Sequence, residues 1–130
     1  MSYTYEYSPL LKAAHVGRLR EAVGWDARTE KYLRILGNTY LCAACFYGGD
    51  PVAYVDVVSD GVDDAYIRDL MVHPEHQHRG IASNLISMIV EAAQGNDIKM
   101  VNVLFEPEFT DFYRKAGFYI MGGGQIDLES

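Results

Sequence analysis

The stretch His73–Ile86, HPEHQHRGIASNLI, contains three of the four histidines of this 130-residue chain and then becomes apolar. It follows the run Ala65–Val72, which is typical of a β-strand, and Pro74 ends that strand because proline cannot donate to the ladder. From Ile81 to Gly95, apolar residues recur with helical spacing. The stretch is therefore predicted to be a polar loop between a strand and an amphipathic helix. Its residues suggest either a metal site or an anion site.

A metal site is disfavoured by the spacing of the histidines. His73, His76 and His78 would need a helix face or a shaped loop with a carboxylate partner, and Pro74 forbids a helix at this point. The spacing also fits no standard zinc pattern. We therefore expect no metal in this loop.

An anion site is favoured by the order of the elements. Gly80 stands where the loop enters the helix, so unpaired backbone N–H groups and the positive end of the helix dipole converge there. Glycine lets the backbone approach a ligand, Ala82 is small, and Arg79 with the histidines adds positive charge. The sequence has neither the Gly-x-x-x-x-Gly-Lys-Ser/Thr of a Walker A loop nor the third glycine of a Rossmann turn. We expect a phosphate-bearing ligand of another class.

Outside this loop, strand and helix patterns alternate in a way that predicts one α+β domain covering residues 1–130. Ser8 is the expected N-cap of the first helix. The expected elements are a strand near Thr4–Tyr7, helices at Ser8–Val23 and about Ala27–Leu36, strands at Tyr40–Tyr47, Val52–Val58 and Ala65–Val72, a helix from Ile81 to Gly95, a strand at Lys99–Phe105, a helix at Glu108–Ala116, and a last hairpin of Phe118–Met121 and Ile126–Leu128.

Composition and charge narrow the classes of function. The chain is 49% hydrophobic and 22% charged, as in ordinary globular proteins. No apolar run reaches the roughly 20 residues of a membrane span, and the N-terminus lacks a secretory signal, so a cytoplasmic location is expected. The net charge of −7 argues against a nucleic-acid partner. Acidic residues gather between Asp56 and Asp69, which favours a cationic small molecule, with a solvated acidic loop as the alternative.

The two cysteines, Cys42 and Cys45, have a spacing that suggests a redox or zinc site. They lie in the predicted strand Tyr40–Tyr47, where residues three apart point to opposite faces of the sheet. No second cysteine pair is present to complete four zinc ligands. Both are expected to be buried structural cysteines.

Two segments resemble the motifs of a known family. The segment Leu70–Ala82 contains the pattern L-x-V-x-P-x-x-Q-x-x-G-x-A at the start of a helix, which resembles the acetyl-CoA signature of the GNAT superfamily of N-acetyltransferases. The segment Phe112–Phe118, FYRKAGF, resembles the second GNAT motif. The order of elements is similar as well, so the resemblance covers essentially the whole chain. It implies a mixed, mostly antiparallel central sheet that is flanked by helices and splayed between its fourth and fifth strands.

The resemblance also implies that acetyl-CoA binds in the splay, and we expect no metal cofactor beside it. The pantetheine arm would pair with backbone groups of the strand end, and the pyrophosphate would lie on the loop. An amine acceptor, either a small molecule or a peptide, would then attack the thioester directly, and members of the family often form homodimers. The implied cofactor-binding residues are Leu70, Met71, Val72, Gln77, His78, Arg79, Gly80, Ile81, Ala82 and Ser83.

Acetyl transfer requires two proton transfers, because the amine must lose a proton and the leaving thiolate must gain one. In the family the tyrosine of the second motif protonates the thiolate, which implies this role for Tyr113. The alternative for Tyr113, one of ten tyrosines, is packing alone.

The general base departs from the family pattern. Many relatives have a glutamate at the position of Arg68 or of Tyr66. Asp69 is the only carboxylate in the predicted strand and is therefore the candidate base, with a structural hydrogen-bonding role as the alternative. Alternation would point Asp69 away from the face of Arg68 unless a β-bulge re-aims it.

A second departure is Glu106, which stands where many relatives have asparagine, so contacts near the pantetheine are expected to differ. Acceptor contacts are expected from the first two helices and the last hairpin loop, including Trp25, Asp26 and Gly122–Gly124. Two alternatives to an N-acetyltransferase stay open. One is a non-catalytic CoA-binding sensor or regulatory module, motivated by the missing glutamate, and the other is a purely structural domain.

Overall fold

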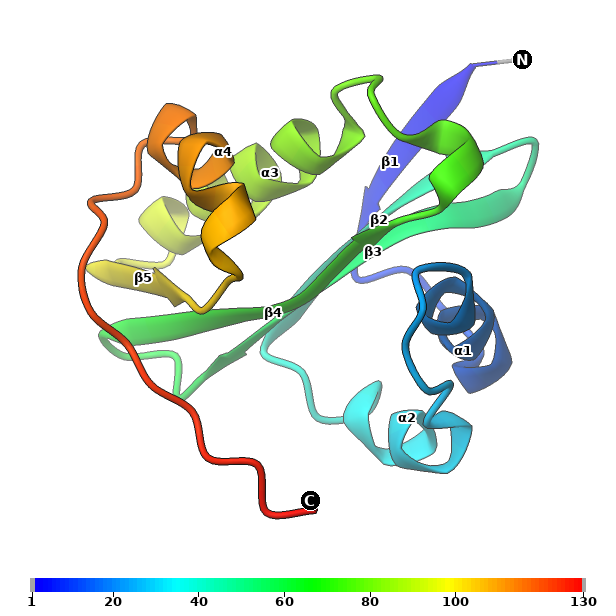
Figure 1. The fold of residues 1–130 in the computed structure, drawn as a ribbon, viewed down its shortest axis with the longest axis horizontal. Coiled ribbons are helices and arrows are strands. Elements are labelled where there is room, and N and C mark those ends of the chain that lie inside the picture. The colour runs from blue at the N-terminus through cyan, green and yellow to red at the C-terminus, as the bar shows by residue number, and fades with distance from the viewer. Residues whose placement is uncertain (1, 130) are drawn as a thin grey trace.

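Five strands form one sheet in the order β1-β2-β3-β4-β5 in the computed structural model of the chain, which describes residues 2–129 (Figure 1). Neighbouring strands are antiparallel except β4 and β5, which are parallel. The predicted α+β domain with a mixed, mostly antiparallel sheet is confirmed.

The elements are β1 (Tyr3–Tyr7), α1 (Ala13–Ala22), α2 (Thr29–Ile35), β2 (Leu41–Tyr47), β3 (Asp50–Ser59), β4 (Asp64–Val72), a 3-10 turn at Pro74–His76, α3 (Ile81–Gly95), β5 (Met100–Val103), a 3-10 turn at Pro107–Phe109 and α4 (Thr110–Lys115).

The splay between the fourth and fifth strands is present. β5 pairs with β4 only over Asp64–Ile67. Beyond Ile67, β4 continues to Val72 without a partner strand on that side among the described residues. The backbone of this half of β4 is therefore free to pair with a ligand.

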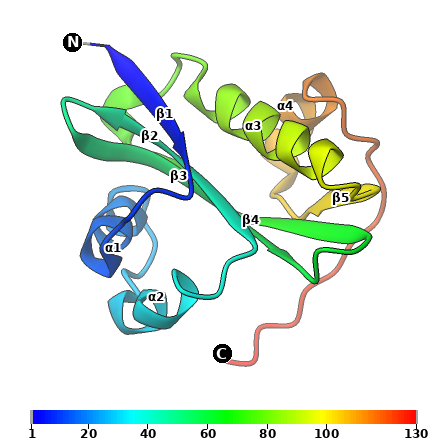
Figure 2. The same ribbon diagram turned by 180° about the vertical axis from the view of Figure 1, so that it is seen from behind.

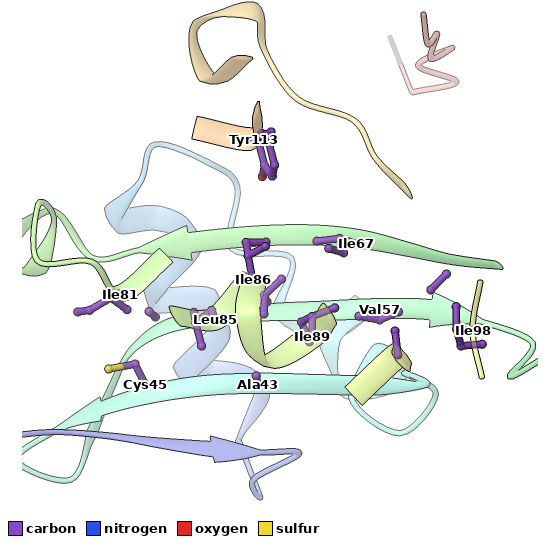
Figure 3. Packing of buried hydrophobic residues seen from close by; sticks show 14 of the residues in the cluster. Ala43, Cys45, Val57, Ile67, Ile81, Leu85, Ile86, Ile89, Ile98 and Tyr113 are labelled. Carbon is purple, nitrogen blue, oxygen red and sulfur yellow. The ribbon is translucent and has the colours of Figure 1, made fainter. Parts of the chain in front are cut away.

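Helices cover both faces of the sheet, with α3 and α4 on one side and α1 and α2 on the other (Figures 1 and 2). On the first face, Leu85 and Ile89 of α3 pack with Val57 of β3 in a buried cluster (Figure 3). On the second face, Val16 of α1 and Tyr32 of α2 belong to a separate buried cluster. None of the helices within residues 2–129 has the length and apolar character needed to span a membrane.

Strand β2 supplies side chains to both clusters. Cys42 belongs to the α1–α2 face and Cys45 to the α3 face. Both thiols are buried and free. The prediction that alternation separates the two cysteines is confirmed.

The first helix begins later than predicted, at Ala13, and its N-cap is Lys12 rather than Ser8. Ser8 has a positive φ of 43° and its N–H donates to the carbonyl oxygen of Cys42 at 2.7 Å. Its hydroxyl oxygen accepts from the N–H of Cys42 at 3.4 Å. Ser8 therefore joins the end of β1 to β2, and the chain turns into the helix only after Lys12.

The predicted C-terminal hairpin is wrong, because residues 118–129 form no paired strand. This tail runs from α4 past the β4–β5 end of the sheet to α2 (Figure 1). There the carboxylate of Glu129 pairs with Lys31 at 2.7 Å and Arg28 at 3.3 Å. Alternating apolar residues are typical of strands, but those of the tail, Tyr119, Met121, Ile126 and Leu128, are exposed and have no partner strand.

Close packing at Gly17 gives a test of the α1–α2 arrangement. A Cβ atom there would lie 2.8 Å from Oγ1 of Thr29 and 3.3 Å from Cβ of Ala27. Gly17→Ala is expected to destabilise the protein by about 1–3 kcal/mol, because overpacking outweighs the better helix propensity of alanine. Gly95→Ala in α3 is the control, since no atom lies within 4 Å of its added Cβ. Chemical denaturation measures both, and equal stabilisation by the two variants would contradict the packing.

Candidate active site

An open groove of about 2540 Å³ follows the splay and continues onto the α1–α2 face of β4. Tyr113 and Asp69, the two predicted catalytic residues, both line it. Of the ten predicted cofactor-binding residues, all line the groove except Arg79. The groove therefore brings the two predicted motifs together although they are far apart in the sequence. The nine lining residues are Leu70, Met71, Val72, Gln77, His78, Gly80, Ile81, Ala82 and Ser83.

The loop before α3 presents free backbone donors to this groove. His78 and Gly80 have positive φ values of 64° and 80°. No side chain caps α3, and its first three residues, Ile81–Ser83, donate their N–H groups to no acceptor among the described residues. The side-chain amide of Gln77 donates to the carbonyl oxygen of Val72 at 3.0 Å and closes the loop. Free N–H groups at the positive end of a 15-residue helix can donate hydrogen bonds to an anion.

The histidines of the loop make contacts within the protein. The ring of His76 is hydrogen-bonded to the hydroxyl of Tyr3 at 2.8 Å and packs against the ring of Tyr47 at 5.1 Å. The ring of His73 accepts from the N–H of Glu75 at 3.1 Å. Within residues 2–129, no three His, Cys, Asp or Glu side chains come together as metal ligands would. His73 and His76 therefore shape the loop.

Tyr113 lies in an aromatic cluster with its hydroxyl open to the groove. Its ring stacks on Phe105 at 4.6 Å and is contacted edge-on by Phe112 and Phe118 at 4.9 and 5.5 Å. Figure 3 shows the ring between α4 and β4, with the hydroxyl directed toward β4. No described residue bonds the hydroxyl, and no buried side-chain oxygen in residues 2–129 lacks a partner, so the oxygen reaches the groove. Burial raises the pKa of Tyr113 to about 12, which keeps the phenol protonated at neutral pH.

A β-bulge re-aims Asp69. The register of β3 and β4 shifts between the pairs Tyr54–Met71 and Asp56–Arg68, so β4 contains one extra residue there. Asp69 has a positive φ of 53°, which non-glycine residues adopt rarely. Its side chain lies on the same face as that of Arg68. Strict alternation would have separated them, and the bulge brings the carboxylate into the part of the groove on the α1–α2 face of β4.

Donors from three elements hold the Asp69 carboxylate. Nη1 of Arg20 in α1 lies 2.6 Å from Oδ2 of Asp69, and Nη2 of Arg68 lies 3.3 Å from the same oxygen. The hydroxyl of Tyr32 in α2 also donates to this oxygen. Burial, together with this carboxylate, raises the pKa of Tyr32 well above its usual value, so the hydroxyl stays a donor.

A buried carboxylate, that of Asp56, holds the guanidinium of Arg68 by an ion pair. Asp56 is fully buried, and its Oδ1 accepts from Nε of Arg68 at 2.6 Å while its Oδ2 accepts from the hydroxyl of Tyr54 at 2.6 Å. Burial raises the pKa of Asp56, and the hydrogen bonds from Arg68 and Tyr54 oppose this shift. The ion pair between Asp56 and Arg68 was not predicted from the sequence. An aspartate inside the apolar run Val52–Val58 could have indicated it, because a buried carboxylate requires a partner.

The acidic residues between Asp56 and Asp69 do not form one continuous negatively charged surface. Asp56 and Asp69 are ion-paired with arginines. Asp60 accepts from the N–H of Val62 at 2.9 Å in the turn after β3 and does not line the groove, whereas Asp64 does. Of the acids in this run, only Asp64 and Asp69 line the groove.

Of the other residues predicted to contact the acceptor, some line the groove and one does not. Trp25 and Gly122–Gly124 line the groove, as does Glu106. Asp26 does not line the groove, but its carbonyl oxygen accepts from Nε of Arg20 at 2.6 Å. The main chain at Asp26 thus helps to fix Arg20.

Comparison with known proteins identifies the family. Residues 8–118 match the model of the Acetyltransferase (GNAT) family. The chain belongs to this family. Among solved structures, a GNAT family acetyltransferase from Streptococcus pneumoniae TIGR4 is 28% identical with a TM-score of 0.79, over 98% of this chain and 99% of the other. A protein of unknown function from meticillin-resistant Staphylococcus aureus has a TM-score of 0.85 at 17% identity, over 97% and 99%, which shows a shared fold.

Curated relatives of this GNAT domain include plant and algal proteins. Serotonin N-acetyltransferase 2, chloroplastic, of Oryza sativa subsp. japonica is 31% identical over 79% of this chain and 56% of the relative. The uncharacterized N-acetyltransferase ycf52 of Gracilaria tenuistipitata var. liui is 27% identical over 78% and 58%. The chain thus spans somewhat under two thirds of the length of these relatives.

Proposed function

We propose that this GNAT domain transfers an acetyl group from acetyl-CoA to a primary amine by direct attack. One observation carries the proposal. A single groove contains the free N–H groups at the start of α3, the unpaired half of β4, the hydroxyl of Tyr113 and the carboxylate of Asp69. The pyrophosphate would bind at the helix, and the pantetheine would pair with β4 beyond Ile67.

The amine would enter from the α1–α2 side of β4. Asp69 Oδ1 has no partner among the described residues and is open to the groove, so it can accept a hydrogen bond from an ammonium group. A proton released from the ammonium passes through the water of the groove. The nitrogen lone pair then attacks the thioester carbonyl, and Tyr113 protonates the thiolate as the C–S bond breaks. The second proton of the attacking nitrogen leaves through the same water and restores the proton of Tyr113. The name of the rice relative supports a small-molecule acceptor.

A panel of primary amines tests the function, with release of free CoA thiol as the readout. Turnover of at least one amine is the expected result. CoA binding without turnover of any amine would instead favour a non-catalytic sensor or regulatory module, for which Arg68 in the usual place of a glutamate is the supporting observation. Absence of CoA binding would contradict both.

Asp69→Asn tests the amine contact. The variant is expected to lower kcat/KM for the acceptor about tenfold, which is the worth of a hydrogen bond to a charged group, with unchanged CoA affinity. Asp60→Asn is the matched control, because it removes the same charge from an acid that does not line the groove. Equal effects of the two variants would mean that only the overall charge matters, and an unchanged kcat/KM in Asp69→Asn would leave Asp69 a structural residue.

A further inference from the structure

Four charged side chains form one hydrogen-bonded cluster on the α1–α2 face of the sheet. Arg20 and Arg68 provide two positive charges, and Asp56 and Asp69 provide two negative charges. The charges of this four-charge cluster therefore cancel. Both oxygens of Asp56 are taken by Arg68 and Tyr54, so Asp56 has nothing to offer a ligand.

Three polar atoms of the four-charge cluster are unused. All donors to Asp69 reach its Oδ2, which leaves Oδ1 without a partner in residues 2–129. Arg68 uses Nε and Nη2 but not Nη1. Arg20 uses Nε and Nη1 but not Nη2. Because no buried side-chain nitrogen or oxygen in this part of the chain lacks a partner, all three atoms are open to water, and their residues line the groove.

The three atoms without a partner determine which charged groups a ligand needs. Asp69 Oδ1 accepts, whereas Arg68 Nη1 and Arg20 Nη2 donate. An ammonium group alone would satisfy the acceptor and cover the guanidinium donors without pairing them, and unpaired charged donors are costly to bury. A carboxylate beside the amine would pair with these donors and keep the total charge at zero. A guanidinium is well suited to a carboxylate because of its planar arrangement of donors.

Apolar and aromatic residues line the groove together with residues of the four-charge cluster. They include Val23, Trp25, Ile35 and Tyr66. Trp25 is 41% exposed, and its ring centroid lies 5.2 Å from the guanidinium carbon of Arg20. An apolar or aromatic side chain of a ligand would contact these residues.

We propose that the acceptor is a zwitterionic amine, that is, a free amino acid with an apolar or aromatic side chain. Its amine binds to Asp69 Oδ1, and its carboxylate binds to the free nitrogens of Arg68 and Arg20. This inference rests on the proposed acetyl transfer. It goes beyond it by excluding peptide N-termini and simple amines as preferred acceptors, since neither has a carboxylate beside the amine.

Matched acceptors test the proposal. L-tryptophan, L-tryptophanamide and tryptamine share the indole ring and the primary amine and differ in the carboxylate, and phenylalanine with phenethylamine forms a second set. The amino acids are expected to have a kcat/KM at least about tenfold above their amide or decarboxylated partners, from one charged hydrogen-bonded contact. Amines that react as well as the amino acids, or amines that react while no amino acid does, would overturn the inference and leave acetyl transfer intact. No turnover of any amine would overturn both.

Two variants connect the selectivity to the arginines. Arg68→Lys keeps a positive charge beside Asp56 but lacks the second terminal nitrogen, and Arg20→Lys makes the same change on α1. In each, the ratio of kcat/KM for tryptophan to that for tryptamine is expected to fall toward one. A general structural defect lowers both values equally and cannot move the ratio by itself, so a fall in the ratio reports the loss of the carboxylate contacts. An unchanged ratio in both variants would overturn the assignment of the arginines.

Discussion

Replacing Tyr113 by phenylalanine is expected to lower the turnover number about 100-fold or more, the lower range for a positioned general acid, with nearly unchanged CoA affinity. The variant removes only the hydroxyl, so the stack on Phe105 and the edge contacts of the ring stay in place. The loss falls on turnover because the hydroxyl acts when the C–S bond breaks. Steady-state kinetics and calorimetry with CoA measure the two quantities.

The pH profile gives an independent check on the same residue. Burial raises the pKa of Tyr113 to about 12, so the phenol stays protonated until the pH approaches that value. Ionisation of Tyr113 is therefore expected to cause no loss of activity below about pH 11.

The control for the Tyr113→Phe variant is Tyr40→Phe, at a partly buried tyrosine that does not line the groove, and this control should keep normal turnover. Normal turnover in Tyr113→Phe would mean that water protonates the thiolate, and a loss of CoA binding would mean that the tyrosine holds CoA.

Gly80→Glu is expected to raise the dissociation constant for CoA about 100-fold or more. A carboxylate at the start of α3 would face the pyrophosphate, and a like-charge contact of this kind costs several kcal/mol. No atom lies within 4 Å of a Cβ at Gly80, but the φ of 80° strains any side chain placed there. The effect of the charge must therefore be measured against a variant with the same strain.

The control for this variant is Gly80→Ala. Both substitutions place a side chain at a residue with φ of 80°, so both carry the same backbone strain, and only one carries charge. Calorimetry with CoA, together with thermal unfolding to confirm that both variants fold, separates the two effects. Equal affinities for the two variants would show that the loop does not hold the phosphates.

The loop and its helix could be predicted because their signals are local. A strand pattern, a glycine and a helical period follow one another within His73–Ile86, and the free N–H groups at Ile81–Ser83 follow from helix geometry. The Asp69 bulge is different. It arises from the register between β3 and β4, and no pattern within Ala65–Val72 specifies that register.

The four-charge cluster and the path of the tail could not be predicted from the sequence for a similar reason. Arg20 and Asp69 are 49 positions apart and meet only when α1 packs on the sheet. The tail has the alternation and glycines of a hairpin, but a strand also needs a neighbouring strand, and in the structure Glu129 reaches α2 instead. Sequence patterns therefore predicted most of the helices and strands and the loop before α3, while long-range packing determined the four-charge cluster and the path of the tail.

The separation of the two buried clusters by the sheet has a consequence for evolution. The α3 face and the α1–α2 face share strands but not side chains, as Cys42 and Cys45 illustrate. Substitutions that are distant and have no common partners add independently in their effects on stability. Mutations in α1 and α2 can therefore accumulate without loosening the packing beneath α3. A protein with this architecture can change the side chains on one side of its sheet while the packing on the other side stays intact.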